Sequence, residues 1–431
     1  MKIYMDTYGC SANQAASEIM LGLLSNKFQI ISKKDEADVI IINSCIVKSP
    51  TEAKILFQIK KIVQEYPHKK LIVAGCMPEV YSMKIRKTAP NASMIGIHHL
   101  SEIENVVDDT LRGKQRIEIG HNSSPKLGYP RIRIDDRIGI VQIAQGCISN
   151  CTYCIVKRVM GPLVSYPEEL ILDEVKRCVL QGCKEIWLTA QDTTAYGLDR
   201  GSTLPSLLQS IMQIDGNFMV RVGMMNPATA YPLVDDLIEV FKHSKLYKFI
   251  HLPLQSGSNA ILRQMKRNYT VEQYFEIIKK FRTVFQDITL STDVIVGFPT
   301  ETEAQFNESL NVITLLQPSL TNISKFGPRE KTPAAKLPPL SSQTIKDRSR
   351  KMTVLCQKIT REKNNEWIGR EETILIVSRG KKGGLEGRTY TYKPVIIDTR
   401  NHELIGKFVN VSIVDAKYSH LLGTLTEEFI R

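Results

Sequence analysis

The chain has 431 residues and a net charge of +12, with 42% hydrophobic and 24% charged residues. This length predicts two to four domains, and the apolar content excludes disorder as the main state. No apolar segment reaches the roughly 20 residues of a membrane span, and no signal segment is visible, so we expect a cytoplasmic protein without membrane association. The chain contains neither G-x-x-x-x-G-K-[ST] nor H-E-x-x-H, which argues against a P-loop NTPase and a zincin.

The first 120 residues alternate strand-like and helix-like segments. Apolar runs precede Cys10, Cys45 and Cys76, and a helix-like stretch follows each of these cysteines. This alternation predicts a parallel sheet, in which the carboxyl ends of the strands share one edge. The three thiolates would meet there and suggest a cluster site, although small cysteines at strand ends are also common in cores. The polar, basic residues 121–137 are predicted to be a linker.

From residue 138 the alternation resumes for six cycles, up to residue 340. The strands are predicted to begin near residues 138, 184, 218, 247, 288 and 319. Thr300 with Glu303 is read as a helix capping box, and Pro167 as a first-turn residue. Six βα units without a Gly-rich dinucleotide fingerprint predict a partial (βα)6 barrel, whose chemistry belongs at the carboxyl ends of its strands.

A C-x3-C-x2-C motif, Cys147, Cys151 and Cys154, follows the first of these strands. Nine cysteines in a chain without an export signal argue against a disulfide framework. Each iron of a 4Fe-4S cube takes one thiolate as a rule, so three thiolates leave one iron open. An open iron suits radical chemistry on S-adenosylmethionine, and the aromatic Tyr153 before the last cysteine adds to the signal. Cys178 and Cys183 are predicted to lie in or near a core, and Cys356, in a helix-like basic stretch, is expected to carry no chemistry.

The C-terminal part is strongly basic. Residues 325–393 hold 17 basic and 7 acidic residues, whereas residues 398–431 hold 4 and 5. Residues 341–369 are predicted to be a basic helical connector, and the short alternating runs in 370–431 predict a small β-barrel, a fold that often binds RNA. The basic block favours a nucleic acid as partner, although a solvated basic surface would have the same composition.

These motifs together resemble the radical SAM methylthiotransferases over the whole chain. The resemblance rests on YGCSANQAASE, NSC and GC near the three early cysteines, on LPLQSGS (252–258) and on DVIVGFPTET (293–302). It implies an α/β chain made of an N-terminal methylthiotransferase domain, a radical SAM barrel and a TRAM-like β-barrel. SYP (165–167) and EIWLTAQDTTAYG (185–197) resemble the archaeal and eukaryotic branch, which methylthiolates N6-threonylcarbamoyladenosine at tRNA position 37. Family members often have Arg where this chain has Met160.

The resemblance also implies cofactors and partners. Cys147, Cys151 and Cys154 would bind the 4Fe-4S cluster that cleaves S-adenosylmethionine, and Cys10, Cys45 and Cys76 a second 4Fe-4S cluster that carries the sulfur. The partners would be the anticodon loop of tRNA and an electron donor such as ferredoxin or flavodoxin. The alternatives are a methylthiotransferase for isopentenyladenosine-37 tRNA or for a ribosomal protein and, more remotely, a non-catalytic iron–sulfur RNA-binding redox sensor.

Further contact residues are predicted from their position and chemistry. Polar or turn-forming residues at the strand ends are candidates for holding the cofactor, together with Tyr153: Gln191, Asp192, Arg221, Gln255 and Gly297. The carboxylate of a threonylcarbamoyl group requires a cationic donor, for which the candidates are Lys157, Arg158, Arg329 and again Arg221. Lys381 and Lys382 are predicted to bind tRNA phosphates.

Overall fold

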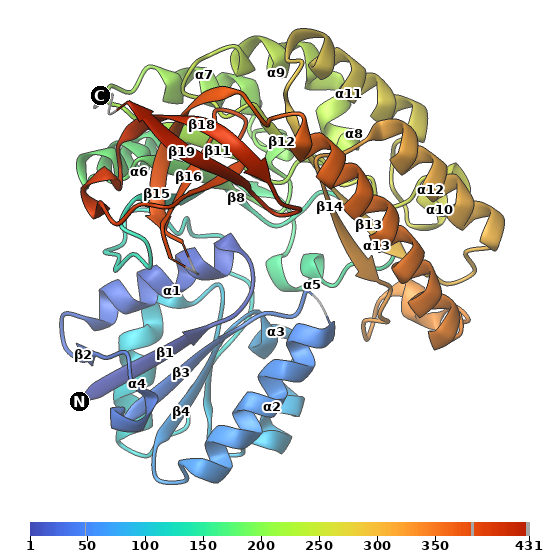
Figure 1. Cartoon of the computed structure of the whole chain (residues 1–431). Coiled ribbons are helices and arrows are strands. Elements are labelled where there is room, and N and C mark those ends of the chain that lie inside the picture. Colours follow the sequence, from blue (N-terminus) through green and yellow to red (C-terminus); the bar gives the residue numbers. More distant parts are fainter. Residues whose placement is uncertain (48, 381–382, 428–431) are drawn as a thin grey trace.

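The computed structural model describes residues 1–47, 49–380 and 383–427 and shows three folded units along the chain (Figure 1). The first is a parallel six-stranded sheet in the order β2-β1-β3-β4-β5-β6. Helix α1 contacts α4 and α2 contacts α3, on either side of the sheet. The central strands β3 and β4 are almost entirely buried apolar runs, as expected where helices cover both faces. The elements of this unit are β1 (Lys2–Thr7), α1 (Ser11–Leu24), β2 (Gln29–Ile30), β3 (Val39–Ser44), α2 (Ser49–Glu65), β4 (Lys70–Gly75), α3 (Cys76–Thr88), β5 (Ser93–Gly96), α4 (Ile103–Leu111) and β6 (Ile117–Glu118).

The second unit is the predicted partial barrel. Its six parallel strands form two three-stranded sheets, β7-β10-β11 and β12-β13-β14, joined by the bridges Val220–Leu246 and Met224–His251. All six strands begin within two residues of the predicted positions, which confirms the βα alternation. The strands are β7 (Ile138–Gln142), β10 (Glu185–Thr189), β11 (Met219–Val222), β12 (Phe249–His251), β13 (Thr289–Val296) and β14 (Leu320–Lys325), with the small antiparallel pair β8 (Ala144–Gln145) and β9 (Val164–Ser165).

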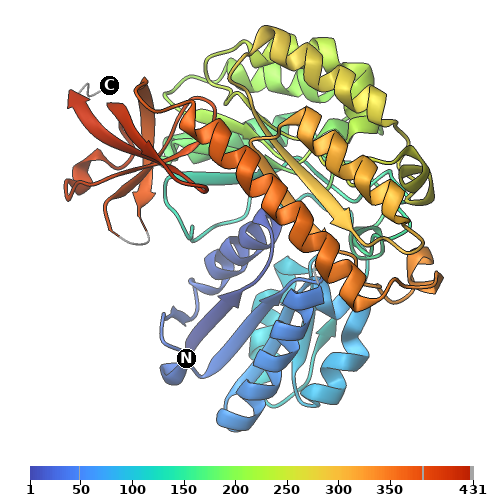
Figure 2. The same ribbon diagram turned by 45° about the vertical axis from the view of Figure 1, so that its right-hand side comes forward.

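Helices surround the outside of these strands. They are α6 (Glu168–Leu180), α7 (Leu204–Met212), α8 (Pro227–Ala230), α9 (Val234–Phe241), α10 (Asn259–Gln264), α11 (Val271–Val284) and α12 (Glu303–Leu316). The short helix α5 (Val156–Met160) packs instead against the first unit. The predicted basic helix is α13 (Ser342–Asn365), which packs against β14 and α12 and runs along the edge of the barrel towards the C-terminal unit (Figure 2). Cys178 and Cys183 are buried in the barrel core, as predicted, and Cys356 of α13 is buried in the same core.

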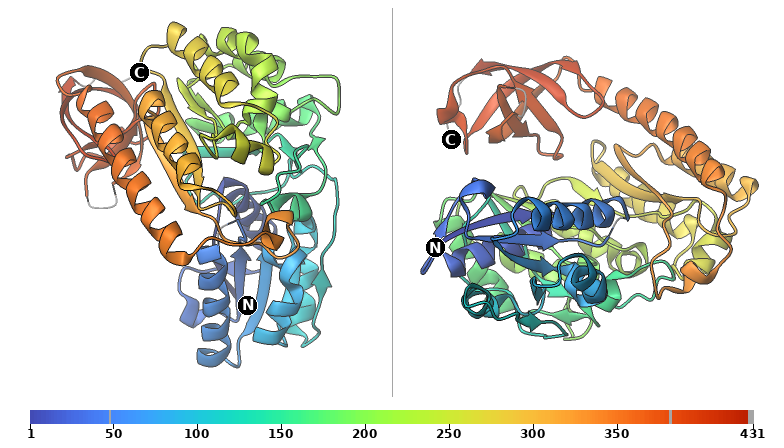
Figure 3. Two further views of the ribbon diagram at one scale, coloured as in Figure 1. Left: turned by 90° about the vertical axis from the view of Figure 1, so that its right-hand side faces the viewer. Right: turned by 90° about the horizontal axis from the view of Figure 1, so that it is seen from below.

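The third unit is a closed barrel in the order β15-β16-β17-β19-β18, which confirms the predicted small β-barrel. It lies against the side of the partial barrel (Figure 3). Leu375, Val377 and Tyr392 of this unit share one apolar cluster with Tyr247 and Phe249 of the partial barrel. The two units are therefore joined by a common core as well as by the chain. The strands are β15 (Glu371–Arg379), β16 (Leu385–Arg388), β17 (Pro394–Ile397), β18 (Phe408–Ala416) and β19 (Leu421–Glu427).

Two predictions about the start of a helix, those for α12 and α6, were wrong by one or two residues. The capping box of α12 is formed by Thr302 and Gln305, not by Thr300 and Glu303. Thr300 has a positive φ of 71° in the preceding loop, and Glu303 turns outward to pair with Arg348 at 3.2 Å. Pro167 is the N-cap of α6 and does not lie in its first turn. No helix in the described part of the chain is long and apolar enough to cross a membrane.

Candidate active site

The central cysteine triad lies in the loop between β8 and α5. The loop is held at Cys147, whose N–H donates to the carbonyl of Gly161 at 3.2 Å, and at Cys154, whose N–H donates to the carbonyl of Cys151 at 3.2 Å. Gly146 has φ of +76°, and a Cβ there would lie 1.7 Å from the carbonyl oxygen of Pro162. Only glycine therefore fits at the start of this loop.

The three thiols lie close enough to influence one another. Burial, followed by the charge of Cys151, raises the pKa of Cys154 to about 11. Burial also raises the pKa of Cys147, and the carboxylate of Asp192 adds to that rise. Such thiols remain protonated without a metal, and a metal must displace their protons when it binds. The triad has the chemistry of a metal–thiolate site rather than that of a free nucleophile.

Arg267 is a site residue that the sequence analysis missed. Its guanidinium donates from Nη1 to Cys151 Sγ at 3.3 Å and from Nη2 to Asn226 Oδ1 at 2.9 Å. Asn226 in turn donates to Ser149 Oγ at 3.1 Å, within the cysteine loop. Arg267 lies in the loop after α10, far from the motif in sequence, and no local pattern marks it. It places a positive charge directly beside one sulfur of the central triad.

Among the predicted cofactor-binding residues, Gln191 and Asp192 lie just after β10. Asp192 is buried, and its carboxylate accepts hydrogen bonds from the hydroxyls of Thr194 at 2.8 Å and Thr229 at 2.9 Å. Gln191 has a buried Oε1 with no hydrogen-bond partner among the described residues. Gln255 has φ of 68° and forms a bridge with Val294. An unpartnered buried amide oxygen beside the cysteine loop fits a donor on a ligand.

The other predicted cofactor-binding residues have different surroundings. Arg221 lies within β11, and its guanidinium packs 5.4 Å from the Trp187 ring centroid and 5.2 Å from that of Tyr392 in the C-terminal barrel. Gly297 has φ of +76° and allows the close approach of Ile345 in α13, whose Cγ1 would lie 2.6 Å from a Cβ. Tyr153 packs against the apolar cluster of Ile261, Met265, Phe298 and Ala334. All three residues make contacts that support the packing of the units.

The predicted cations for the substrate carboxylate are already engaged. Lys157 Nζ donates to Asn150 Oδ1 at 2.7 Å, and Arg158 Nη1 donates to the carbonyl of Lys331 at 3.2 Å. Arg329 is buried and pairs with Glu52 of α2 at 2.8 Å. Of these, Arg158 has an exposed side chain. Lys381 and Lys382 lie outside the described residues.

The early cysteines meet as the sequence predicts, because β1, β3 and β4 are neighbours in the sheet. Cys10, Cys45 and Cys76 directly follow these three strands at one edge. Gly9, with φ of +115°, lets the strand ends approach, since a Cβ there would lie 2.6 Å from Cys45 Cβ and 2.9 Å from its Sγ. Burial raises the pKa of Cys76, and Cys10 and then Cys45 add to the rise, which places the three thiols within electrostatic reach of one another.

Asn13 is a second residue that the sequence analysis missed. Its buried amide donates to the carbonyls of Tyr8 and Ser44, both at 2.8 Å, and its Oδ1 accepts from Cys76 Sγ at 3.5 Å. One side chain thus connects the ends of β1 and β3 to the cysteine that follows β4. The polar Asn in the apolar face of α1 was the available signal, because buried amides are retained where they have partners.

Neither triad resembles a site for one metal ion. Within residues 1–47, 49–380 and 383–427, no group of three or more His, Cys, Asp or Glu residues is arranged to hold a single ion. The thiolates of a 4Fe-4S cube each bind a different iron, whereas the ligands of zinc converge on one ion. Each triad thus offers three thiols, and a 4Fe-4S cube takes one thiolate per iron as a rule.

The first unit meets the barrel near the early triad and next to the helix that follows the central triad. Ser11, next to Cys10, contacts Thr189 at the carboxyl end of β10, with their hydroxyl oxygens 3.2 Å apart. Helix α5, which follows the central triad, lies between the two units (Figure 1). Its Val159 and Met160 are buried in the apolar core of the first unit. Met160 thus makes an apolar contact where family members often have Arg.

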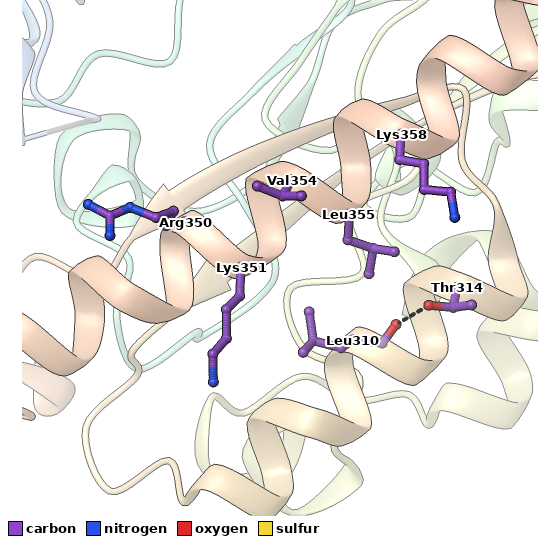
Figure 4. A pocket seen from close by; sticks show the side chains of 7 residues that line it. All are labelled: Leu310, Thr314, Arg350, Lys351, Val354, Leu355 and Lys358. Atoms are coloured by element: carbon purple, nitrogen blue, oxygen red, sulfur yellow. Dashed lines mark hydrogen bonds between the residues drawn. The ribbon is translucent and has the colours of Figure 1, made fainter.

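A shallow groove elsewhere on the surface is separate from these residues. It lies between α12 and α13 and is lined by apolar Leu310, Val354 and Leu355 and by basic Arg350, Lys351 and Lys358 (Figure 4). None of the residues that line it is a predicted site residue.

Comparison with known proteins extends over the whole chain. Residues 2–96 match the family described as "Uncharacterized protein family UPF0004", residues 141–313 the radical SAM superfamily and residues 366–426 the TRAM domain. A probable threonylcarbamoyladenosine tRNA methylthiotransferase of Methanothermobacter thermautotrophicus is 41% identical over 423 residues, or 98% of this chain and 99% of that protein. The human threonylcarbamoyladenosine tRNA methylthiotransferase is 32% identical over 98% of this chain and 73% of its own length.

The fold also matches solved structures. The radical S-adenosylmethionine methyltransferase TsrM of Kitasatospora setae superposes with a TM-score of 0.58 over 78% of this chain and 77% of that chain, at 12% identity. At this identity the match shows a common fold.

Proposed function

The chain belongs to the family of the threonylcarbamoyladenosine tRNA methylthiotransferases, and we propose that it adds a methylthio group to C2 of N6-threonylcarbamoyladenosine at position 37 of tRNA. The observation that carries this function is the contact between Ser11, which follows Cys10, and Thr189 at the carboxyl end of β10, where the first unit meets the barrel. Insertion of sulfur at an unactivated carbon requires a radical source and a sulfur carrier at the same substrate atom.

The two triads have different roles in this proposal. Cys147, Cys151 and Cys154 hold the 4Fe-4S cluster that binds S-adenosylmethionine, and Cys10, Cys45 and Cys76 hold a second 4Fe-4S cluster. The bound cofactors supply one-electron cleavage of S-adenosylmethionine and the sulfur to be transferred. Arg267 orients Cys151 through its bond to Sγ, and the free Oε1 of Gln191 accepts from the cofactor. Tyr153, Asp192 and Gly297 fix the surrounding loops by packing and hydrogen bonds, and Arg221 and Gln255 complete the barrel interior.

The substrate side of the proposal depends on charge. An anticodon-loop base is unpaired, so it enters the site at a lower unstacking cost than a duplex base. We propose that Arg158, and beside it Lys157, bind the threonylcarbamoyl carboxylate, because Arg158 is exposed next to the central triad. Arg329 would first have to leave Glu52. Lys381 and Lys382 of the TRAM-like unit bind tRNA phosphates in this proposal, and reversing their charge should reduce the slope of the salt dependence.

The rest of the proposal concerns the electron donor, the cellular location and the domain boundaries. The electron donor is a small carrier such as ferredoxin or flavodoxin, since reductive cleavage requires single electrons. The enzyme acts in the cytoplasm, where its tRNA substrate is found. Its domains are residues 1–120, 138–340 and 370–431, with 121–137 as linker and 341–369 as helical connector.

The decisive experiment offers purified enzyme three tRNAs, with threonylcarbamoyl-, isopentenyl- or unmodified adenosine at position 37. Mass spectrometry of the nucleosides should show methylthio product only from the first. Equal turnover of the isopentenyl form would assign the enzyme to another substrate.

Cys151→Ala should abolish cleavage of S-adenosylmethionine, whereas Cys45→Ala should remove the second cluster yet retain some uncoupled cleavage. Unchanged iron content and product yield in Cys45→Ala would contradict the second-cluster assignment.

A further inference from the structure

Cys178 and Cys183 are a pair of cysteines that the proposed function does not use. They lie at the end of α6, where the N–H of Cys183 donates to the carbonyl of Cys178 at 3.0 Å. The N–H of Gly182, with φ of +88°, donates to the carbonyl of Val179 at 3.0 Å. These two bonds form a Schellman motif, in which the side chains at the ends of the outer bond commonly touch. Here both of these side chains are thiols, and both belong to the barrel core.

Arg133 of the linker brings a positive charge to this pair. Its Nη2 donates to Cys178 Sγ at 3.3 Å, and its Nη1 donates to Gln181 Oε1 at 2.7 Å. The Cys178 side chain cannot move far from this contact, because it is packed closely against β7. A Cβ at Gly139 of that strand would lie 2.8 Å from Cys178 Sγ. The sulfur is therefore fixed between the strand and the guanidinium.

The carboxylates nearby are paired with other guanidiniums. Glu174 pairs with Arg131 at 3.0 Å and with Arg177, and Glu18 lies 3.9 Å from Arg131. Among the described residues, Arg133 makes no ion pair with a carboxylate. A guanidinium held away from water is stabilised by an anion, and a thiolate at Cys178 is the anion in contact with this one.

The two thiols share one proton in this arrangement. The hydrogen bond from the Cys183 thiol, followed by the charge of Arg133, lowers the pKa of Cys178, although burial opposes the change. The same hydrogen bond raises the pKa of Cys183, and burial adds to that rise. Cys178 is thus the thiolate and Cys183 the proton-bearing partner, which is the division of roles between an attacking and a resolving cysteine.

A small reagent can reach the pair without opening the barrel. The residues between the two cysteines form the last turn of α6, where Leu180 is 87% exposed and Gln181 is also exposed. Helix ends of this kind open locally at a small free-energy cost, because few buried contacts hold them. Opening this turn uncovers Cys183 and the sulfur of Cys178.

We propose that Cys178 and Cys183 are a redox modification site, which forms an intramolecular disulfide with a small-molecule disulfide as the oxidant. The Cys178 thiolate attacks one sulfur of the oxidant, whose S–S bond breaks and releases a thiolate. The Cys183 thiol gives its proton to that thiolate, and its sulfur attacks the Cys178 sulfur and releases the second half of the oxidant. Two electrons pass from the protein thiols to the oxidant, which becomes two thiols.

The disulfide carries no charge, so its formation leaves Arg133 without an anion. The linker at this point also contacts α1 of the first unit. The N–H of Ile132 donates to the carbonyl of Glu18 at 3.0 Å, and the N–H of Ile134 donates to Glu18 Oε1 at 3.3 Å. Oxidation therefore acts where the linker joins the first unit to the barrel. This inference is independent of the proposed function, because it requires neither cluster nor tRNA.

The test uses the full-length, reconstituted enzyme in anaerobic buffers with increasing ratios of oxidised to reduced glutathione. Acid quenching, alkylation of free thiols and mass spectrometry of the peptides then measure the fraction of the Cys178–Cys183 disulfide. Arg133→Gln removes the cation that stabilises the reduced pair, so the equilibrium constant for oxidation should rise about tenfold or more. Lys176→Gln is the matched control, because it removes an exposed charge of the same helix, and its constant should equal that of the wild type.

Two cysteine variants test the order of attack. Cys183→Ser should accumulate a mixed disulfide between glutathione and Cys178, whereas Cys178→Ser should leave Cys183 unmodified in the same buffer. The reverse pattern would contradict the assignment of Cys178 as the attacking thiolate. Free thiols at both positions of the wild type in the most oxidising buffer would overturn the inference, and so would equal equilibrium constants for wild type and Arg133→Gln. If Arg133→Gln does not fold, the wild-type titration and the two cysteine variants still decide the question.

Discussion

Arg267 should set the reduction potential of the cluster at the central triad. Its Nη1 lies 3.3 Å from Cys151 Sγ in a buried environment. A charge-assisted hydrogen bond contributes about 1.5–3 kcal/mol, which corresponds to about 0.07–0.13 V for a one-electron couple. A Coulomb estimate at 3.3 Å and an effective dielectric constant of about 20 gives an upper limit of about 0.2 V. Reduction adds negative charge, so loss of the guanidinium lowers the potential.

The assay is a potentiometric titration of Arg267→Gln, followed by electron paramagnetic resonance. The midpoint potential should fall by about 0.1 V, and cleavage of S-adenosylmethionine should slow with a fixed reductant. Asn226→Ala is the matched control, because it removes the other partner of Arg267 and keeps the charge, so its potential should stay close to that of the wild type. Equal potentials in wild type and Arg267→Gln, with both clusters fully loaded, would refute the reasoning.

Three further predictions concern the supporting structure. Asn13→Ala removes the amide that holds the strand ends near Cys76, so the iron content should fall by about one cluster. An unchanged iron content would contradict this role of Asn13. Tyr392→Ala should destabilise the junction of the two barrels by about 1–3 kcal/mol, seen as faster hydrogen exchange in β15–β17, and Tyr392→Phe should not. Burial raises the pKa of Glu372 from 4.5 to about 7, so the folded state holds a proton that the unfolded state releases. The free energy of unfolding should therefore decrease as the pH rises from about 4.5 to about 7, which unfolding experiments can measure. Glu372→Gln should abolish this part of the pH dependence.

Local sequence was sufficient for the elements and for the positions of the cysteines at the ends of strands and in one loop. The six barrel strands and the strands before Cys10, Cys45 and Cys76 are short apolar runs whose period and length depend on neighbouring residues only. Cys147, Cys151 and Cys154 lie within one loop, so their spacing alone indicates their chemistry. Even here the local signal had limited resolution, since Thr300 and Thr302 both fit the start of α12 and only the backbone conformation distinguishes them.

The tertiary structure decided which charges face the cysteines. Arg267 and Cys151 are 116 residues apart, and Arg329 meets Glu52 across 277 residues. Sequence reasoning placed Arg329 as a free cation for the substrate, yet the fold pairs it with Glu52. The free energy of a charge depends on the dielectric and the counter-ions around it, and both are determined by how distant elements pack. The sequence therefore determined where the cysteines meet, and only the packing of the linker and the barrel against the first unit decided which cation accompanies each triad.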